Sequence, residues 1–204
     1  ERIKYFIPKP EDSYNIVTDP EQVSSSFSLM IPIENKELKT QGDYYENFQN
    51  EIAYSIFYER MNDISKEMNS PFESAYIYES GLGEENNNLE LFVRPIEGRY
   101  LESIERIKKE YDRIQSYGFS KIEFDNLISG YKSSLEDMYN NKNSEETINK
   151  LNYLMGFINS ESIYISTEYY YNLSLSILEK ITLEDINFAT KDWFDKTYRT
   201  IIVQ

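Results

Sequence analysis

The sequence contains no histidine and no cysteine. Without histidine there is no Ser-His-Asp triad and no zinc site built on imidazole ligands. Without cysteine there is no thiol nucleophile, iron–sulfur cluster or thiolate zinc site, and the redox compartment stays undecided. The chemistry that remains open is acid–base catalysis by carboxylates, a Ser/Lys pair, or a metal site built from oxygen ligands.

Positive charge is also scarce, because 21 Lys and Arg stand against 36 Asp and Glu, a net charge of −15. We therefore expect neither a nucleic-acid partner, which needs basic side chains on its phosphates, nor binding to an anionic membrane surface. No apolar run approaches the ~18 residues of a membrane span, and no signal-peptide pattern is visible. We expect no membrane insertion, and a weak preference for basic peptides that added salt reduces.

Two carboxylate pairs stand out, Glu84 and Glu85 in "GLGEENNN" (81–88) and Glu145 and Glu146 in "SEETI" (144–148). Neither stretch has the ligand spacing of a calcium loop, and "GLG" lacks the third glycine of a dinucleotide-binding turn. We interpret the first pair as a polar loop tip between strands and the second as favourable charge in a first helical turn. Neither is a convincing pair for a carboxylate-based enzyme.

What the sequence does contain is ample material for a core, since 40% of the residues are hydrophobic and 19 Tyr and 11 Phe are among them. Its 204 residues fit one large domain or two small ones. Because no linker or internal repeat is visible, we expect a single α+β domain over residues 1–204. The chain opens at "ERIKYF" without Met, which we interpret as a fragment of a larger multi-domain protein.

The N-terminal half shows strand patterns. A short β-branched stretch covers 14–19, and in 22–31 apolar residues fall on odd positions with Ser24, Ser26 and Ser28 between them. This period of two predicts a strand with one apolar and one polar face, and Pro32 predicts that it ends there or lies at an edge. Ranges 72–80 and 88–96 predict a hairpin joined by the polar "GLGEENN".

A long helix is predicted between these strands. Asp43 is expected to cap it with Glu46 completing a capping box, and the apolar stripe extends to Met68 before "NSP" (69–71) stops it.

The C-terminal half is predicted to be helical from Arg99 on, with Ile104, Ile107, Tyr111 and Ile114 on the buried stripe. Later helices are expected over 145–158, with Ile148, Leu151, Met155 and Ile158 on one face, over 167–180, and after the cap Thr182. The last stretch, 198–204, is expected to be a strand. The predicted fold class is α+β: a mixed or antiparallel sheet with helices on one face, in the order β-β-α-β-β-α-α-α-α-α-β.

The stretch "YGFSKIEF" (117–124) carries three devices that define a helix–helix joint. Gly118 is expected to take the left-handed conformation that ends one helix. Ser120 and Glu123 form the capping box of the next helix, and Phe119 and Phe124 have the spacing of a hydrophobic staple. The stripe of the second helix then runs from Phe124 to Met138.

These residues resemble a known family. The similarity rests on four stretches in this order: "IVTDPEQVSSSFSLMI" (16–31), the long helix with Arg60 near its middle, "YGFSKIEFDNLISGY" (117–131) and "ITLEDINFATKDWF" (181–194). Together they resemble a non-catalytic domain of the insulinase/pitrilysin (mitochondrial-processing-peptidase-like) zinc metallopeptidases. The similarity extends over nearly the whole chain.

The resemblance implies a role. Family members are built from repeated α+β domains that enclose an unfolded peptide, and one domain carries the zinc motif H-x-x-E-H. No part of this chain matches that motif, so we expect no catalytic, cofactor or metal residue here, and zinc only in the catalytic domain of the parent protein. Expected partners are the other domains of the peptidase and, weakly, unfolded peptide. Ser24, Ser26 and Ser28 would face the chamber, whereas the 118–124 joint would be structural.

Alternatives remain open at this stage. The chain fits a domain of a catalytically inactive family member that acts as a partner subunit, or an unrelated acidic interaction module that uses its tyrosines for contact. The compartment is undecided by the residues, and only the placement of many bacterial family members favours the periplasm or cell envelope.

Overall fold

The computed structural model describes residues 12–19, 21, 24–34, 36–81, 86–144, 147–160, 162–191, 193 and 200–203. The elements follow the predicted order, which confirms the α+β class. They are β1 (Ser13–Ile16), β2 (Phe27–Glu34), α1 (Gln41–Ser65), β3 (Phe72–Gly81), β4 (Asn86–Pro95), α2 (Tyr100–Tyr117), α3 (Lys121–Asn141), α4 (Thr147–Ser160), α5 (Thr167–Lys180), α6 (Leu183–Ala189) and β5 (Thr200–Val203). Within the described part of the chain, no helix is long and apolar enough to cross a membrane.

The chain divides into two compact units. The first comprises the described residues of Glu1–Asn35, Tyr54–Gly118 and Ala189–Gln204, and the second comprises Lys36–Ala53 and Phe119–Phe188. Helix α1 therefore contributes its first half to the second unit and its second half, from Tyr54, to the first. A single domain over all 204 residues stays a prediction.

The first unit is built on a mixed five-stranded sheet in the order β1-β5-β2-β4-β3. Only β1 and β5 pair in parallel, while the other described pairs are antiparallel. The predicted hairpin is present as β3 and β4, although its tip at residues 82–85, with Glu84 and Glu85, lies outside the described residues. Glu145 and Glu146 lie outside them too.

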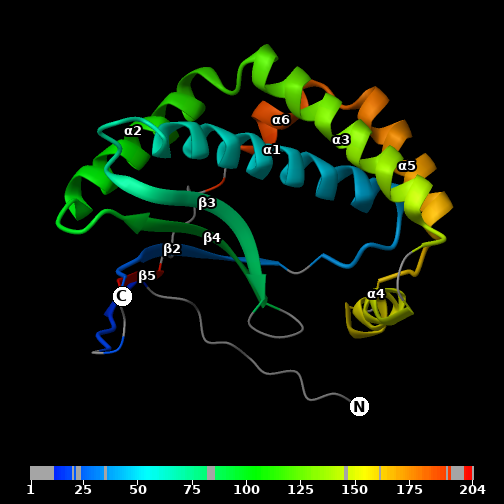
Figure 1. Ribbon diagram of the computed structural model, residues 1–204, viewed down its shortest axis with the longest axis horizontal. Coiled ribbons are helices and arrows are strands. Elements are labelled where there is room, and N and C mark those ends of the chain that lie inside the picture. Colours follow the sequence, from blue (N-terminus) through cyan, green and yellow to red (C-terminus); the bar gives the residue numbers. More distant parts are fainter. Residues whose placement is uncertain are drawn as a thin grey trace. The chain divides into compact units, whose positions relative to one another are not determined.

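One face of this sheet is covered by α2 and by the second half of α1 (Figure 1). Alternate strand residues point toward these helices and supply the core because a strand presents every second side chain to one face. The buried strand residues on this face are Ile31, Ala75, Ile77, Leu89, Leu91 and Val93. The helices meet them with Ile56, Phe57, Met61, Ile64, Ile107 and Ile114. The prediction of helices on one face is confirmed for this unit.

Strand β2 differs from its predicted bounds. It begins at Phe27 rather than at 22, and positions 22 and 23 lie outside the described residues. It also continues past Pro32 to Glu34. Pro32 therefore lies inside the strand, opposite Asn88 of β4.

Helix α1 begins earlier than predicted. Its capping box joins Thr40 and Asp43: the Thr40 N–H donates to the Asp43 carboxylate at 2.6 Å, and the Asp43 N–H donates to Thr40 Oγ1 at 3.2 Å. Asp43 is therefore the third helical residue and not the cap, and these hydrogen bonds lower its pKa. Glu46, predicted to complete the box, pairs with Lys36 instead.

The buried stripes of α2 and α4 also differ from expectation. Along α2 the buried residues are Ser103, Ile107, Glu110 and Ile114, whereas Ile104 is 47% exposed. The sequence pattern counted only apolar side chains, and Ser103 is buried because its hydroxyl donates to the Pro71 carbonyl at 2.8 Å. On α4 the whole predicted stripe is exposed.

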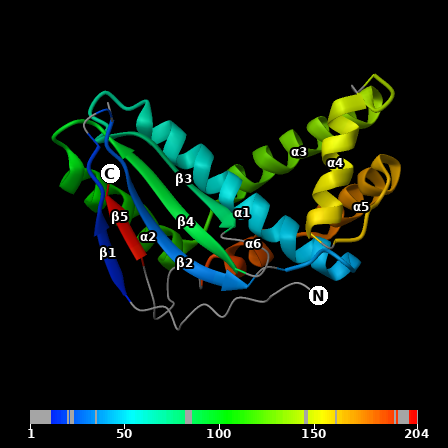
Figure 2. The ribbon, with the colours of Figure 1, turned by 90° about the horizontal axis from the view of Figure 1, so that it is seen from below.

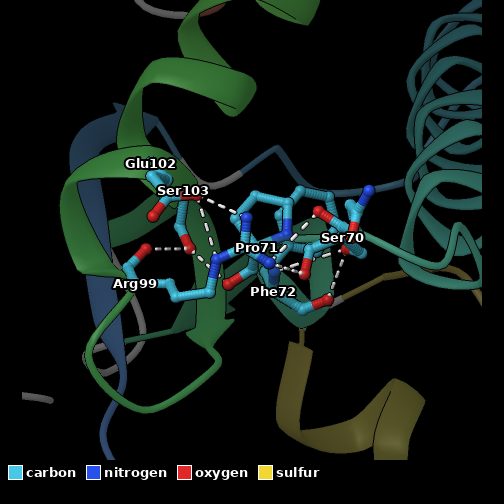
Figure 3. A network of polar contacts seen from close by, with 7 residues as sticks. Ser70, Pro71, Phe72, Arg99, Glu102 and Ser103 are labelled. Atoms are coloured by element: carbon cyan, nitrogen blue, oxygen red, sulfur yellow. Dashed lines mark hydrogen bonds and ion pairs between the residues drawn. The ribbon is translucent and has the colours of Figure 1, made fainter.

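Figure 3 shows the polar network that joins the start of α2 to the segment before β3. The Arg99 guanidinium donates to the carbonyls of Asn69 and Ser70 at 3.1 and 2.7 Å and also bonds Glu102. Ser70 Oγ donates to the Phe72 carbonyl at 2.8 Å. These bonds satisfy main-chain carbonyls at and just before the start of β3, and they tie this segment to the start of α2.

The second unit packs α3 and α5 with the first half of α1. The Phe48 ring lies 6.4 Å from the Tyr131 ring and 6.3 Å from the Tyr170 ring. Helix α5 has the predicted bounds, and Ser166 caps it by accepting the Tyr169 N–H at 3.2 Å. The predicted cap Thr182 is confirmed, because it exchanges hydrogen bonds with Asp185 at the start of α6.

Candidate functional site

The sheet face opposite the helices of the first unit is the candidate site, and Figure 2 looks toward it. We call it the open face. Its membership follows from register, because residues opposite each other in antiparallel strands share a face: Ser28 pairs with Phe92, Met30 with Glu90, and Tyr76 and Tyr78 with the same two β4 residues. Its central residues are Ser28, Met30, Tyr76, Tyr78, Glu90 and Phe92.

A carboxylate is buried in the middle of this face. Glu90 is only 4% exposed, and it accepts a hydrogen bond from Ser28 Oγ at 2.7 Å. Tyr78 also hydrogen-bonds Glu90; burial raises the pKa of the phenol, and the neighbouring carboxylate raises it further. Tyr78 therefore stays protonated and remains a donor. Two hydroxyl donors thus compensate the cost of burying this carboxylate.

Aromatic rings surround that polar centre. The Tyr76 and Phe92 rings stack with centroids 5.1 Å apart, and the Tyr76 and Tyr78 rings lie 5.6 Å apart. Tyr78 is 36% exposed, so part of this cluster reaches solvent. The open face therefore offers flat apolar surface and phenol hydroxyls.

The predicted chamber-facing serines are placed differently from one another. Ser24 is exposed and precedes β2, and Ser26 also precedes it but is 7% exposed. Ser28 lies on the open face and is 6% exposed, with its hydroxyl engaged by Glu90. Ser26 and Ser28 are thus covered by neighbouring residues, and a chamber-facing role of the three serines stays a prediction. Burial follows for Ser28 because the larger Tyr78, Glu90 and Phe92 side chains stand on the same face.

The predicted joint at 118–124 is present, with one correction. The capping box of α3 is confirmed: the Ser120 N–H donates to Glu123 at 2.8 Å, and the Glu123 N–H donates to Ser120 Oγ at 3.3 Å. Gly118 ends α2 at φ 71° and ψ −164°, not in the predicted left-handed helical region. This conformation is open almost only to glycine, so the need for glycine is stricter than predicted.

The two phenylalanines of the joint differ in burial. Phe119 is 3% exposed, and its N–H donates to Asn187 Oδ1 at 2.7 Å, whereas Phe124 is only half-buried. Phe119 is therefore the main apolar anchor of the joint. A direct contact between the two rings stays a prediction. The bond to Asn187 could not be predicted locally, since 68 residues separate the partners.

Among the residues that the structure describes, the side chains do not suit a zinc site. The sequence has neither histidine nor cysteine, and no group of three Asp or Glu side chains gathers among the described residues. Nothing in the described part thus supplies the donor set of an H-x-x-E-H centre.

Sequence analysis named no residue of strands β3 and β4 as a site residue. Tyr76, Tyr78, Glu90 and Phe92 are the ones that the structure brings together. The signal was Glu90, a charged residue inside the otherwise apolar stretch from Leu89 to Val93. A carboxylate buried at that position needs hydrogen-bond donors, and the strand register places the hydroxyls of Ser28 and Tyr78 beside it.

Comparison with known proteins gave matches among structures only. No family model matches the sequence, and no curated protein gives a significant match. The whole chain aligns with the periplasmic protease PqqL from Escherichia coli at 15% identity and a TM-score of 0.89, covering 22% of that protein. Against the structure of the first half of PqqL the TM-score is 0.90 at 14% identity, and 44% of that chain is covered.

Two further structures carry family names. A predicted insulinase family protease from Yersinia pestis aligns with 95% of the chain at 14% identity and a TM-score of 0.79, with 42% of it covered. A peptidase M16 inactive domain from Pseudomonas fluorescens aligns with 99% of the chain at 12% identity and a TM-score of 0.66, with 45% covered. The fold is that of the M16, insulinase-like peptidases. The resemblance predicted from sequence is thereby confirmed at the level of the fold, and the chain spans less than half of each of these four structures.

Proposed function

We propose that this chain is a non-catalytic, substrate-confining domain of a pitrilysin-like M16 zinc peptidase that degrades or processes peptides. The observation that carries the proposal is the alignment of the whole chain with the first half of PqqL. The absence of histidine supports a non-catalytic role, because the H-x-x-E-H motif needs two histidines. Zinc is accordingly expected in another domain of the parent protein.

The open face is the proposed chamber wall. Tyr76, Tyr78 and Phe92 offer aromatic surface to an extended peptide, and the exposed Ser24 adds a small polar contact beside it. Ser26 and Ser28 support this wall from within. Weak binding is expected from one wall alone, because a chamber holds its peptide with several surfaces at once.

A second candidate is a domain of a catalytically inactive M16 protein that serves as a partner subunit. The similarity to the Pseudomonas inactive domain favours it. The two candidates differ in whether another part of the parent protein carries H-x-x-E-H. In the first case the parent protein is active and replacing the first histidine of that motif abolishes the activity, whereas in the second case the parent protein has neither the motif nor the activity.

The compartment and partners are proposed with the function. PqqL is a periplasmic protease, and we propose the periplasm or cell envelope of a bacterium for this protein. The proposed partners are the other domains of the same peptidase and unfolded peptide. Nucleic acid is not among them, in keeping with the net charge of −15.

The isolated chain is expected to have no peptidase activity. Purified protein with added zinc and an unstructured peptide should cleave no faster than a buffer control, measured by mass spectrometry of the peptide. The parent protein containing this chain should cleave the same peptide and lose that activity with a chelator. Chelator-sensitive turnover by the isolated chain contradicts the non-catalytic role, whereas an inactive parent protein supports the partner-subunit candidate.

A further inference from the structure

A cavity of about 450 Å³ lies within the second unit, between the N-terminal ends of α1 and α5 and the segment that precedes α5. Its volume falls in the range of cavities that hold small ligands or single side chains. Most of its wall is apolar or aromatic. The residues that form this part of the wall are Tyr44, Ile163, Tyr164, Ile165, Tyr169 and Leu173.

The cavity offers hydrogen-bond donors more than acceptors. Tyr169 Oη already accepts from Gln41 Nε2 at 3.0 Å, and no acceptor is described for its own proton. The hydroxyl of Tyr44, a residue that is 6% exposed, has no hydrogen-bond partner among the described residues. Burial raises the pKa of Tyr44, with a further contribution from Tyr169, so this phenol stays protonated. The hydroxyls of Thr40 and Ser166 are engaged in capping their helices.

The charge around the cavity argues against an anionic ligand. Lys39 on the wall pairs with Glu37, while Asp43 and Glu168 occupy the first turns of α1 and α5 beside it. The surroundings are therefore acidic on balance. A free carboxylate is repelled there, whereas a neutral carbonyl can accept the phenol hydrogen bonds without that cost.

The apolar surface continues beyond the cavity onto α4. The Tyr164 ring lies 5.5 Å from the Phe157 ring and 6.1 Å from the Tyr153 ring. Around them α4 exposes Ile148, Leu151, Leu154, Met155 and Ile158 by 41–57%. An exposed apolar surface of this extent on one 14-residue helix indicates contact with another molecule.

We propose that this cavity binds an apolar segment of an extended peptide. One aliphatic or aromatic side chain of the peptide occupies the cavity, a backbone carbonyl accepts the Tyr169 hydroxyl proton, and neighbouring apolar residues lie along α4. The inference rests on the proposed function, and it gives the second unit a peptide-contact region of its own, built from helices. On this proposal the cavity and α4 select peptides that contain a hydrophobic segment.

The test uses the full 204-residue chain and a fluorescein-labelled, acetylated and amidated peptide of about twelve residues. The peptide has a central Leu-Phe-Leu flanked by Gly and Asn, and a control peptide carries Ser at the three central positions. Binding is followed by fluorescence anisotropy. The key variant is Ile163→Asp, which places a charge on the cavity wall at a side chain that is 52% exposed and so keeps the fold. Ile122→Asp, at a 73% exposed position outside the cavity, is the matched control.

We expect the Leu-Phe-Leu peptide to bind and the serine peptide to bind at least about ten-fold more weakly, since burial of one large apolar side chain is worth that factor. Ile163→Asp should weaken the first peptide about ten-fold, Tyr169→Phe by a few-fold, and Ile122→Asp less than two-fold. Equal affinity of the two peptides, unchanged binding by Ile163→Asp, or no binding of either peptide overturns the proposal. Any of these leaves the chamber-wall function standing if the parent protein still cleaves peptides.

Discussion

At the scale of single residues, stability is concentrated where polar and apolar burial coincide. Phe119 combines a buried ring with a main-chain bond to Asn187, next to a capping box that is largely exposed. Ser28 is small, yet it donates to a carboxylate that is 4% exposed. The cost of changing a residue is therefore set by what its removal leaves unsatisfied rather than by its size.

The joint gives a first prediction. Phe119→Ala should lower the free energy of unfolding by about 3–5 kcal/mol because it opens a cavity, and Ser120→Ala by about 1 kcal/mol because it removes a cap. Phe124→Ala should fall between them, since that ring is half-buried. Urea denaturation of the three variants measures how much unfolding free energy each one loses. Equal losses for Phe119→Ala and Ser120→Ala are incompatible with Phe119 as the anchor.

The open face gives a second prediction. Ser28→Ala should destabilise the protein by about 1–3 kcal/mol, because it takes a donor from the buried Glu90 carboxylate. Ser24→Ala is the matched control at an exposed position and should stay within about 0.5 kcal/mol of the parent chain. Thermal unfolding measures the stability of both variants against the parent chain. An indistinguishable pair means that the hydrogen bond to Glu90 is dispensable.

At the scale of elements, helices with similar sequence patterns have different surroundings. α2 buries Ile107 and Ile114 against the sheet, whereas α4 leaves a comparable row of apolar residues exposed. Periodicity shows which residues share a helix face, but not whether another element covers that face. The capped starts of α3, α5 and α6 depend on residues within one turn, and two of these three capping residues were predicted.

The exposure of α4 gives a third prediction. Ile148→Lys and Ile158→Lys should each change stability by less than about 0.5 kcal/mol, since both side chains are more than half exposed. Ile114→Lys, at a position that is 1% exposed, should unfold the protein because it buries an unpaired charge. Circular dichroism with urea titration compares the three. Strong destabilisation by the α4 variants shows that this helix is covered in solution.

At the scale of the whole molecule, the many tyrosines make stability sensitive to alkali. Burial raises the pKa of Tyr170 to about 12, and burial with nearby carboxylates raises the pKa of Tyr54 and of Tyr78. A raised pKa in the folded state means that the neutral phenol is favoured there. The resulting stability is fully present below pH ~10, the unfolded value, and is lost as pH rises through the folded pKa.

The fourth prediction follows from the loss of stability as these tyrosines ionise at high pH. The free energy of unfolding should be nearly constant from about pH 8 to about pH 9.5 and should fall progressively from about pH 10 toward about pH 12. Tyrosinate absorbance near 295 nm should show a class of tyrosines that ionises only with unfolding. Tyr170→Phe should make this class smaller. Ionisation of every tyrosine near pH 10 in the folded protein contradicts the prediction.

Much of the architecture could be predicted from the sequence because it depends on neighbours along the chain. The order of strands and helices, the bounds of α5, the hairpin of β3 and β4 and the Ser120–Glu123 box all follow from periodicity and local hydrogen bonding. The absence of histidine equally determined that no H-x-x-E-H motif lies in this chain.

Only the tertiary structure decided which side chains meet across long sequence separations. Glu90 meets Ser28 through strand register, 62 residues apart, and Phe119 meets Asn187 through helix packing. Burial of Ser28 and exposure of α4 depend on what the rest of the fold places above each face, which no local pattern contains. The sequence thus determined the elements and their local caps, whereas packing decided which faces are covered, because burial is a property of the assembled chain.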